Sequence, residues 1–513
     1  MSRFKRFAHS LVSGYLLLGA NVVYTLLSIP LALHYLSLKE FGLWSLTSQI
    51  AGYLTMIDLG MNTSVSRILI DKKDSRADGS YGAAIKTGAL VGVSQGSIVC
   101  LVGLGLLGVL PHWLRVDPEL STEFFWLMLG QVLLTSIAFP ARIFGQVLYA
   151  WQRMDISNYS QIAQMFVWMV ARGGGFAAGL GIYSLLLSLV AGSICSTFIC
   201  AIACRRLGLW PKRGEWGATS RQQFHELFSY GADVFLIAIG TQLIMSSQVI
   251  LVTRLLGLEA AGTWNVMTKV FTLQLQILLR FIANTMPAFA EMMARHELTR
   301  LRTNYRSLFI SVSVLSGLCA ILLAAGNSLF VSIWTHGKIH WATQNDFLLA
   351  LWLLLLTQQC CHNSFIACLK EIRELKYTYL IEGAAFIGAA YWILPRAGFT
   401  GMLTTSIVCL VTFTWANGTF RVARLAAHQE GQSLWLWMLP LVRLLLMLVP
   451  IWLVADWFLR DLPDLVHFIV ICGLIGVLGL VIALRFALPR ELALELAARL
   501  PLPLKRTCLL LIQ

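Results

Sequence analysis

The chain has 513 residues, of which 58% are apolar and only 12% are charged, and its formal net charge is +14. Soluble globular chains carry about 25% charged residues, so this composition excludes a water-soluble protein and requires lipid around most of the outer surface. The basic residues are scattered through short segments and form no single footprint, which excludes a nucleic-acid-binding protein.

Apolar runs long enough to cross a bilayer recur along the whole chain. One span needs about 20 apolar residues that rise 1.5 Å each. The first run is too long for the core of a signal peptide, so we expect it to be a retained helix. The sequence predicts about fourteen transmembrane helices, at residues 10–36, 41–68, 84–110, 122–148, 159–180, 183–204, 227–253, 262–288, 307–334, 346–369, 378–394, 398–420, 434–455 and 464–486.

Lysine and arginine are distributed unequally between alternate loops. With the N-terminus inside, 28 of the 39 basic residues fall in inner segments and 6 in outer loops. This asymmetry predicts that both the N- and C-termini are cytoplasmic. Membrane lipids, above all the anionic headgroups of the inner leaflet, are the expected neighbours of these residues. The cytoplasmic tail, residues 489–513, begins with an amphipathic pattern that predicts an interfacial helix.

The turn before the second predicted span is similar to the turn before the eighth. Three residues recur at an offset of 220, namely Leu38, Gly42 and Trp44, matched by Leu258, Gly262 and Trp264. Six spans separate the two turns, and because six is even the two blocks have the same orientation, as in parallel repeats of transporters. We therefore predict an all-α polytopic membrane protein with an N-terminal lobe of helices 1–6 (1–206), a C-terminal lobe of helices 7–12 (207–425), helices 13 and 14 (426–488), and the tail.

At motif level the chain resembles a known family. The matching segments are Ile29-Pro30-Leu31, Tyr35-Leu36, Phe41-Gly42-Leu43-Trp44, Ile57-Asp58-Leu59-Gly60 and Arg67, then Phe228-Ser229-Tyr230-Gly231, Ala261-Gly262-Thr263-Trp264 and Pro287. They resemble the polysaccharide-transport family of bacterial flippases, which export lipid-linked O-antigen and related repeat units. This family belongs to the multidrug/oligosaccharidyl-lipid/polysaccharide superfamily. Gln248 departs from the family pattern, in which many members carry an acid late in the seventh helix, and this puts ion coupling at that position in doubt.

The resemblance implies a function in polysaccharide biosynthesis, including that of lipopolysaccharide. Two lobes would surround a central cavity and move a polyprenyl-pyrophosphate-linked oligosaccharide across the bacterial inner membrane by alternating access. The cargo would be the repeat unit of an O-antigen, a capsule or an exopolysaccharide. A polysaccharide polymerase and glycosyltransferases are the candidate protein partners. No cofactor is implied.

Polar stripes run along several apolar spans, where charged side chains usually face protein or a wet cavity. At about 100° per residue, each stripe occupies one helix side: Lys269, Gln276, Arg280 and Asn284; Gln131, Thr135, Arg142 and Gln146; Gln161, Gln164, Trp168 and Arg172. We predict that a cationic cavity binds pyrophosphate or an acidic sugar through Arg172, Lys269, Arg280, Arg142, Gln276 and Asn284. Alternatively, these residues are buried structural partners or snorkelling side chains.

Asp58 is the acid that lies deepest in a predicted span. It is the candidate for carrying a coupling proton or Na⁺; alternatively, it pairs with a cation or caps polar backbone near Gly60. Asp233 and Glu382 lie nearer the inner ends of their spans and are expected at the interface. Three consecutive glycines, 173–175, lack the strand-loop-helix setting of a phosphate loop, which argues against nucleotide binding.

Three rival functions stay open. A multidrug or organic-ion antiporter should have an acidic or aromatic cavity, whereas the predicted one is basic. Charge does not separate the proposed cargo from lipid II. A membrane enzyme of glycan assembly would need catalytic residues on a sizeable outer loop, and the predicted outer loops are short. We therefore expect a transporter with no enzymatic activity, no catalytic residue and no metal site.

Overall fold

The computed structural model describes residues 3–58, 60–218, 236, 239–369, 373–428, 431, 433–490 and 492–494. Within these residues, all regular elements are helices. The chain divides into two compact units, residues 1–263 and 264–513. The predicted all-α fold is confirmed.

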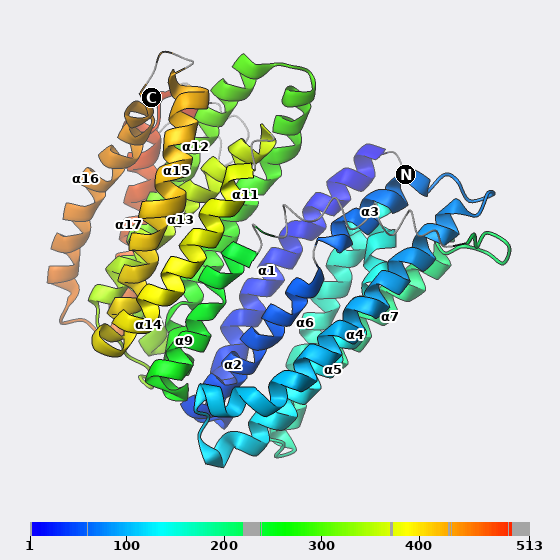
Figure 1. Ribbon diagram of the computed structural model, residues 1–513. Coiled ribbons are helices and arrows are strands. Elements are labelled where there is room, and N and C mark those ends of the chain that lie inside the picture. The colour runs from blue at the N-terminus through cyan, green and yellow to red at the C-terminus, as the bar shows by residue number, and fades with distance from the viewer. Residues whose placement is uncertain are drawn as a thin grey trace. The chain divides into compact units, whose positions relative to one another are not determined.

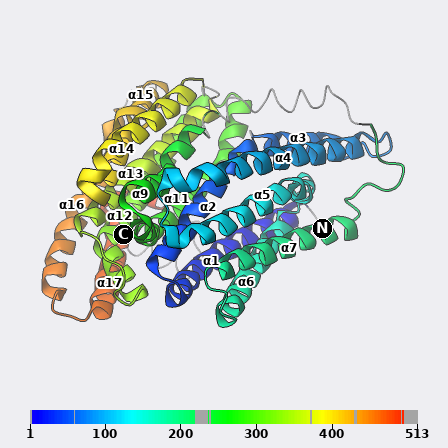
Figure 2. The ribbon, with the colours of Figure 1, turned by 60° about the horizontal axis from the view of Figure 1, so that its bottom comes forward.

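The first unit is a bundle of long helices, coloured blue to green in Figures 1 and 2. Its elements are α1 (Arg3–Tyr35), α2 (Leu38–Leu54), α3 (Met61–Lys72), α4 (Ser80–Leu114), α5 (Ser121–Ala150), α6 (Met154–Ala177), α7 (Tyr183–Arg206), α9 (Ser247–Leu256) and the first residues of α10 (Leu258–Met267). Each of the first six predicted spans falls on one of these helices, except that 41–68 is divided between α2 and α3. The unit extends beyond residue 206 because α9 packs against α2; the lobe boundaries themselves stay a prediction.

A row of glycines on α4 brings this helix close to α5. A Cβ atom added to Gly92 would lie 2.8 Å from the Cα of Pro140 and 2.9 Å from the carbonyl oxygen of Phe139. Gly96 faces the carbonyl group of Ser136, which lacks its usual helical donor because Pro140 has no N–H. In lipid, where apolar side chains gain little from leaving the solvent, such small residues allow the backbone contacts that hold helices together.

We expect Gly92→Ala to destabilise the protein by about 1–3 kcal/mol, the usual effect of adding atoms to a full contact. Gly105→Ala on the same helix is the matched control, because a Cβ atom at Gly105 would meet nothing within 4 Å. There the better helix propensity of alanine should leave stability unchanged or raise it by up to about 1 kcal/mol. Thermal unfolding of both purified variants measures the difference, and equal melting temperatures would contradict the proposed contact.

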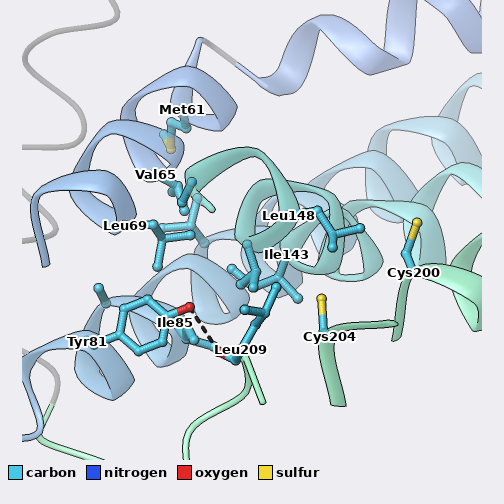
Figure 3. Packing of buried hydrophobic residues seen from close by; sticks show 14 residues of the cluster. Met61, Val65, Leu69, Tyr81, Ile85, Ile143, Leu148, Cys200, Cys204 and Leu209 are labelled. Atoms are coloured by element: carbon cyan, nitrogen blue, oxygen red, sulfur yellow. Dashed lines mark hydrogen bonds between the residues drawn. The ribbon is translucent and has the colours of Figure 1, made fainter. Parts of the chain in front are cut away.

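A buried cluster at one end of the first unit joins α3, α4, α5 and α7 (Figure 3). Tyr81 is fully buried in it and donates a hydrogen bond of 3.0 Å to the carbonyl oxygen of Leu209. Arg76 donates another, of 2.8 Å, to the carbonyl oxygen of Gly208. Cys200 and Cys204 are buried in the same cluster and act there as small apolar residues. The cluster fixes the ends of α3 and α5, which carry two of the arginines described below.

The second unit is also helical. Its elements are the end of α10, α11 (Lys269–Ala294), α12 (Leu298–Trp334), α13 (Gln344–Cys368), α14 (Arg373–Leu410), a π-helical turn (Val411–Trp415), α15 (Ala416–Val422), a second π-helical turn (Ala423–Ala427), α16 (Leu434–Leu459), α17 (Asp464–Ile482) and a third π-helical turn (Ala483–Ala487). Non-helical backbone at Gly398, with φ 54° and ψ −143°, interrupts α14. The break lies where the sequence predicts the boundary between spans 378–394 and 398–420.

Nine helices among the described residues are long and apolar enough to cross a membrane, or ten if α10 and α11, which meet at a bend of 44°, form one span. The predicted number of fourteen is consistent with this count. The stretch 374–427, counted once, covers two predicted spans, and span 227–253 lies partly outside the described residues. The protein is therefore a multi-pass membrane protein. Nearly all of the predicted amphipathic tail lies outside the described residues.

Candidate functional site

The second predicted span is broken in its middle, and the break positions Asp58. α2 ends at Leu54, a 3-10 turn covers Thr55–Asp58, and α3 starts after Gly60, whose φ of 73° favours glycine. A break of this kind leaves backbone carbonyls without helical donors. Gln95 of α4 satisfies two of them, because its amide donates to the carbonyl oxygens of Asp58 at 2.9 Å and Ile57 at 3.3 Å.

The Asp58 carboxylate pairs with the Arg142 guanidinium of α5. The closest nitrogen and oxygen are 3.3 Å apart, and the side chains are 22% and 32% exposed, respectively. Asp58 also accepts a hydrogen bond of 3.4 Å from the backbone N–H of Asn62, while Arg142 lies 4.1 Å from the centre of the Phe139 ring. Both alternatives considered for Asp58, pairing with a cation and capping backbone, occur here. Ion coupling through it stays a prediction.

Arg142 lines a cavity of about 800 Å³ between α3, α5 and α6, which we call the Arg142 cavity. Its lining residues are Asn62, Ser66, Arg67, Ile70, Arg142, Gly145, Gln146, Tyr149, Met154, Ser157 and Gln161. Two guanidinium groups, from Arg67 and Arg142, thus border one space, and this lining contains no carboxylate. A hydrogen bond from the Gln146 amide to the Asn62 side chain joins α5 to α3 across it.

Sequence reasoning missed Arg67 as a site residue: it lies at the end of the predicted span 41–68 and counts there among the basic residues of the inner segments. A helix wheel that runs through residues 41–68 without interruption cannot place it, because the break at Gly60 resets the direction of every later side chain. The signal that could have found it is Gly60 itself, since a glycine after an acid within an apolar span marks a potential break.

A second cavity, of about 350 Å³, lies in the same unit and contains Arg172; we call it the Arg172 cavity. It is lined by Tyr24, Trp44, Ser48, Ala51, Gly52, Thr55, Gln131, Leu134, Thr135, Arg172 and Leu189, from α1, α2, α5, α6, α7 and the 3-10 turn. The predicted stripes of α5 and α6 are therefore each divided between the two cavities. On α5, Gln131 and Thr135 border the Arg172 cavity and Gln146 borders the Arg142 cavity. On α6, Arg172 borders the former and Gln161 the latter.

Arg172 is deeply buried, with an exposure of 6%. Its guanidinium lies 5.7 Å from the centre of the Tyr24 ring, and its Nε atom has no hydrogen-bond partner among the described residues. Within the same residues, no acidic side chain forms an ion pair with it. A buried charge without an acidic partner is destabilising, which makes Arg172 a candidate for binding an anion.

The stripe predicted on the eighth span lies on α11, in the second unit. Lys269 is the first residue of α11 and is half-buried, whereas Gln276, Arg280 and Asn284 are exposed. Phe271 and Leu278 are buried as predicted for the opposite side, but Ile277 is 43% exposed. Because Arg142 and Arg172 line cavities of the first unit, a single cationic cavity that includes the α11 residues stays a prediction.

Glu382 differs from its expected place at the membrane interface. It is 1% exposed and lies within α14, and its Oε2 atom has no hydrogen-bond partner among the described residues. Tyr379, one turn earlier, accepts hydrogen bonds from Gln359 at 2.8 Å and from Asn363 at 2.7 Å. The distance of Glu382 from the span end suggested an interfacial side chain, but the carboxyl group lies inside the second unit, where Thr414 of the first π-helical turn is the polar group beside it. Asp233 lies outside the described residues.

The fold is similar to that of solved transporters. The inward-facing conformation of a multidrug resistance MATE family transporter of the MOP superfamily matches with a TM-score of 0.66 and 12% identity, over 78% of this chain and 95% of that one. An outward-facing conformation of a MATE family transporter of this superfamily matches with a TM-score of 0.56 and 11% identity, over 82% and 96%. A MOP superfamily transporter from Pyrococcus furiosus, described as having a reverse polarity of its binding pocket, matches with 0.51 and 11%, over 82% and 96%.

At these identities the likeness shows the fold alone: the molecule is a multi-pass membrane protein with the fold of these transporters. No curated protein matches the sequence. The family model described as polysaccharide biosynthesis protein matches residues 12–293, more than half of the chain, and the chain belongs to this family. The resemblance found from the motifs is confirmed.

Proposed function

We propose that this protein is a flippase that moves a polyprenyl-pyrophosphate-linked oligosaccharide across the bacterial inner membrane by alternating access. The cargo would be a repeat unit of an O-antigen, a capsule or an exopolysaccharide. Membership in the polysaccharide biosynthesis family supports a role in glycan export. The fold supports transport, because structures with this fold include inward-facing and outward-facing conformations.

The observation that carries the proposal is the Arg142 cavity, where Arg67 and Arg142 border one space of about 800 Å³. Guanidinium groups bind phosphate oxygens through paired N–H donors, so two of them suit the multiply charged pyrophosphate. The Gln146, Asn62 and Gln161 amides beside them offer further donors and acceptors for the first sugar. The prenyl tail would stay in lipid while the headgroup occupies the cavity.

The charges of the cavity argue against the main rival within the superfamily. A site for organic cations should present acids or several open aromatic faces, but this lining has two arginines, no acid and a single aromatic ring, that of Tyr149. A lipid II flippase would present the same charges, so the glycan has to be identified by experiment.

Flipping by the purified protein tests the proposal directly. In proteoliposomes that contain a fluorescent polyprenyl-pyrophosphate oligosaccharide, the wild-type protein should move the label between leaflets, as shown by its accessibility to an added lectin. A protein that leaves the label in place, or that moves an organic cation and no glycan, would contradict the flippase proposal.

The predicted binding residues are tested in the same assay. Arg172→Ala, Lys269→Ala and Arg280→Ala should each lower export by about tenfold or more, the effect of losing one charge-assisted hydrogen bond. Arg443→Ala in α16 is the control, because Arg443 is an exposed arginine of an apolar helix outside both cavities. Wild-type export by all three variants at equal protein abundance would remove these residues from the site.

A further inference from the structure

The Arg172 cavity differs in chemistry from the Arg142 cavity. It has one guanidinium group where the other has two, and it adds the aromatic rings of Tyr24 and Trp44 to hydroxyl and amide groups such as those of Thr135 and Gln131. A single cation suits a single negative charge better than a pyrophosphate. Its volume of about 350 Å³ is at the small end of the range for ligand pockets.

Trp44 is less buried than its counterpart in the sequence repeat. Its repeat counterpart, Trp264, is 2% exposed and lies against the rings of Trp341 and Phe399, with centroid distances of 6.3 and 5.9 Å. Trp44 is only partly buried and borders the cavity. A tryptophan ring beside hydroxyl and amide groups suits the apolar face of a pyranose ring, which it covers while the polar groups bind the sugar hydroxyls.

Arg172 adds the charge. It is 6% exposed, and its Nε atom has no hydrogen-bond partner among the described residues. Gln131, by contrast, is held in place, because its amide donates a hydrogen bond of 3.0 Å to Thr47. A carboxylate that enters the cavity would supply the anion that the described residues do not provide for Arg172.

We propose that the Arg172 cavity is a subsite for a carboxylated pyranose, so that the glycan carried by this protein contains an acidic sugar. This proposal rests on the proposed flippase function and adds the class of substrate to it. Arg172 binds the sugar carboxylate, Trp44 covers the ring, and Thr135 and Gln131 contact hydroxyl groups. The pyrophosphate occupies the separate cavity between Arg67 and Arg142.

Binding of free sugars to the purified, detergent-solubilised protein tests the subsite without any need for transport. Calorimetric titration with D-glucuronate should show saturable binding, at least about tenfold tighter than binding of D-glucose or inorganic phosphate. Arg172→Gln should weaken glucuronate binding by roughly tenfold or more, the effect of one charge-assisted hydrogen bond, and leave the weak binding of glucose unchanged. Trp44→Leu should weaken both sugars, and Arg443→Gln neither.

Three results would overturn the subsite: equal affinity for glucose and glucuronate, equal affinity for phosphate and glucuronate, or unchanged glucuronate binding in Arg172→Gln. The melting temperature of ligand-free Arg172→Gln separates binding from structure. Removal of a buried charge without an acidic partner should leave that temperature unchanged or raise it, whereas a marked fall would assign Arg172 a structural role. If Arg172→Gln does not fold, Trp44→Leu decides by itself. Glucuronate binding in a protein that moves no lipid-linked glycan would refute the flippase and keep the subsite.

Discussion

A double variant, Asp58→Asn with Arg142→Gln, should remain folded and lose glycan export by about tenfold or more. The ion pair between these residues is partly buried, so its two charges stabilise each other within the first unit. Removing both charges leaves two neutral amides that can still hydrogen-bond, and such paired replacements are often neutral for stability. Export should fail, because Arg142 would no longer offer a charge to the pyrophosphate.

The single variants separate the two roles of Arg142. Arg142→Gln alone leaves the Asp58 carboxylate without its cation, which should lower the free energy of unfolding by about 1–3 kcal/mol, between the values typical of exposed and fully buried pairs. Asp58→Asn alone should keep export measurable, because Arg142 stays charged. If the double variant regains wild-type export at equal abundance, Arg142 acts only as the structural partner of Asp58.

The same Asp58→Asn variant tests ion coupling. Transport by a protein that couples through Asp58 should lose its dependence on the proton or Na⁺ gradient when the carboxylate becomes an amide. Export that keeps its full dependence on the gradient would rule out coupling through Asp58, and the buried Glu382 would then be the next acid to replace.

The sequence was sufficient to predict the helices and several cavity residues, because both follow from local patterns. Lipid requires about 20 apolar residues per span, and charges within such spans turn toward protein or water. This reasoning predicts that Arg142 and Arg172 face protein or water, and both border cavities. Span length and the direction of a charged side chain can both be predicted from one helix at a time.

The arrangement of these residues could not be predicted, because it depends on breaks and on neighbouring helices. The helix ends at Leu54, and α3 starts again after Gly60, so the direction in which Arg67 points does not continue from α2. The stripes on α5 and α6 look continuous on a helix wheel. In the structure α2 lies beside Gln131 and Thr135 of α5, whereas α3 lies beside Arg142 and Gln146, so two cavities form. Glu382 was expected at the membrane interface because of its distance from the span end, but its burial depends on how α14 packs against α13 and the first π-helical turn, which a single span does not reveal.

The faint sequence repeat has a physical counterpart in the first unit. Gly42 of α2 faces the backbone carbonyl of Leu258, and Gly262 of α10 faces that of Leu38, where an added Cβ atom would lie 2.6 Å from the oxygen. Each glycine thus contacts the backbone at the start of the other motif, as two equivalent segments do when they cross about a twofold axis. The helix starts differ, since a capping box of Ser37 and Glu40 begins α2, whereas Gly257, with a φ of 96°, precedes α10.

Because this contact is reciprocal, Gly42→Val and Gly262→Val should destabilise the protein by similar amounts, about 1–3 kcal/mol each. Both should also lower export, since α2 carries Trp44 and leads into the break at Asp58. Each new side chain would have to displace backbone atoms, which yield less easily than the end of a flexible side chain. Gly19→Val in α1 is the control, because a Cβ atom there would meet nothing within 4 Å. The test is to measure the melting temperature and the export rate of the three variants. If only Gly42→Val or only Gly262→Val loses stability, the two glycines do not make equivalent contacts.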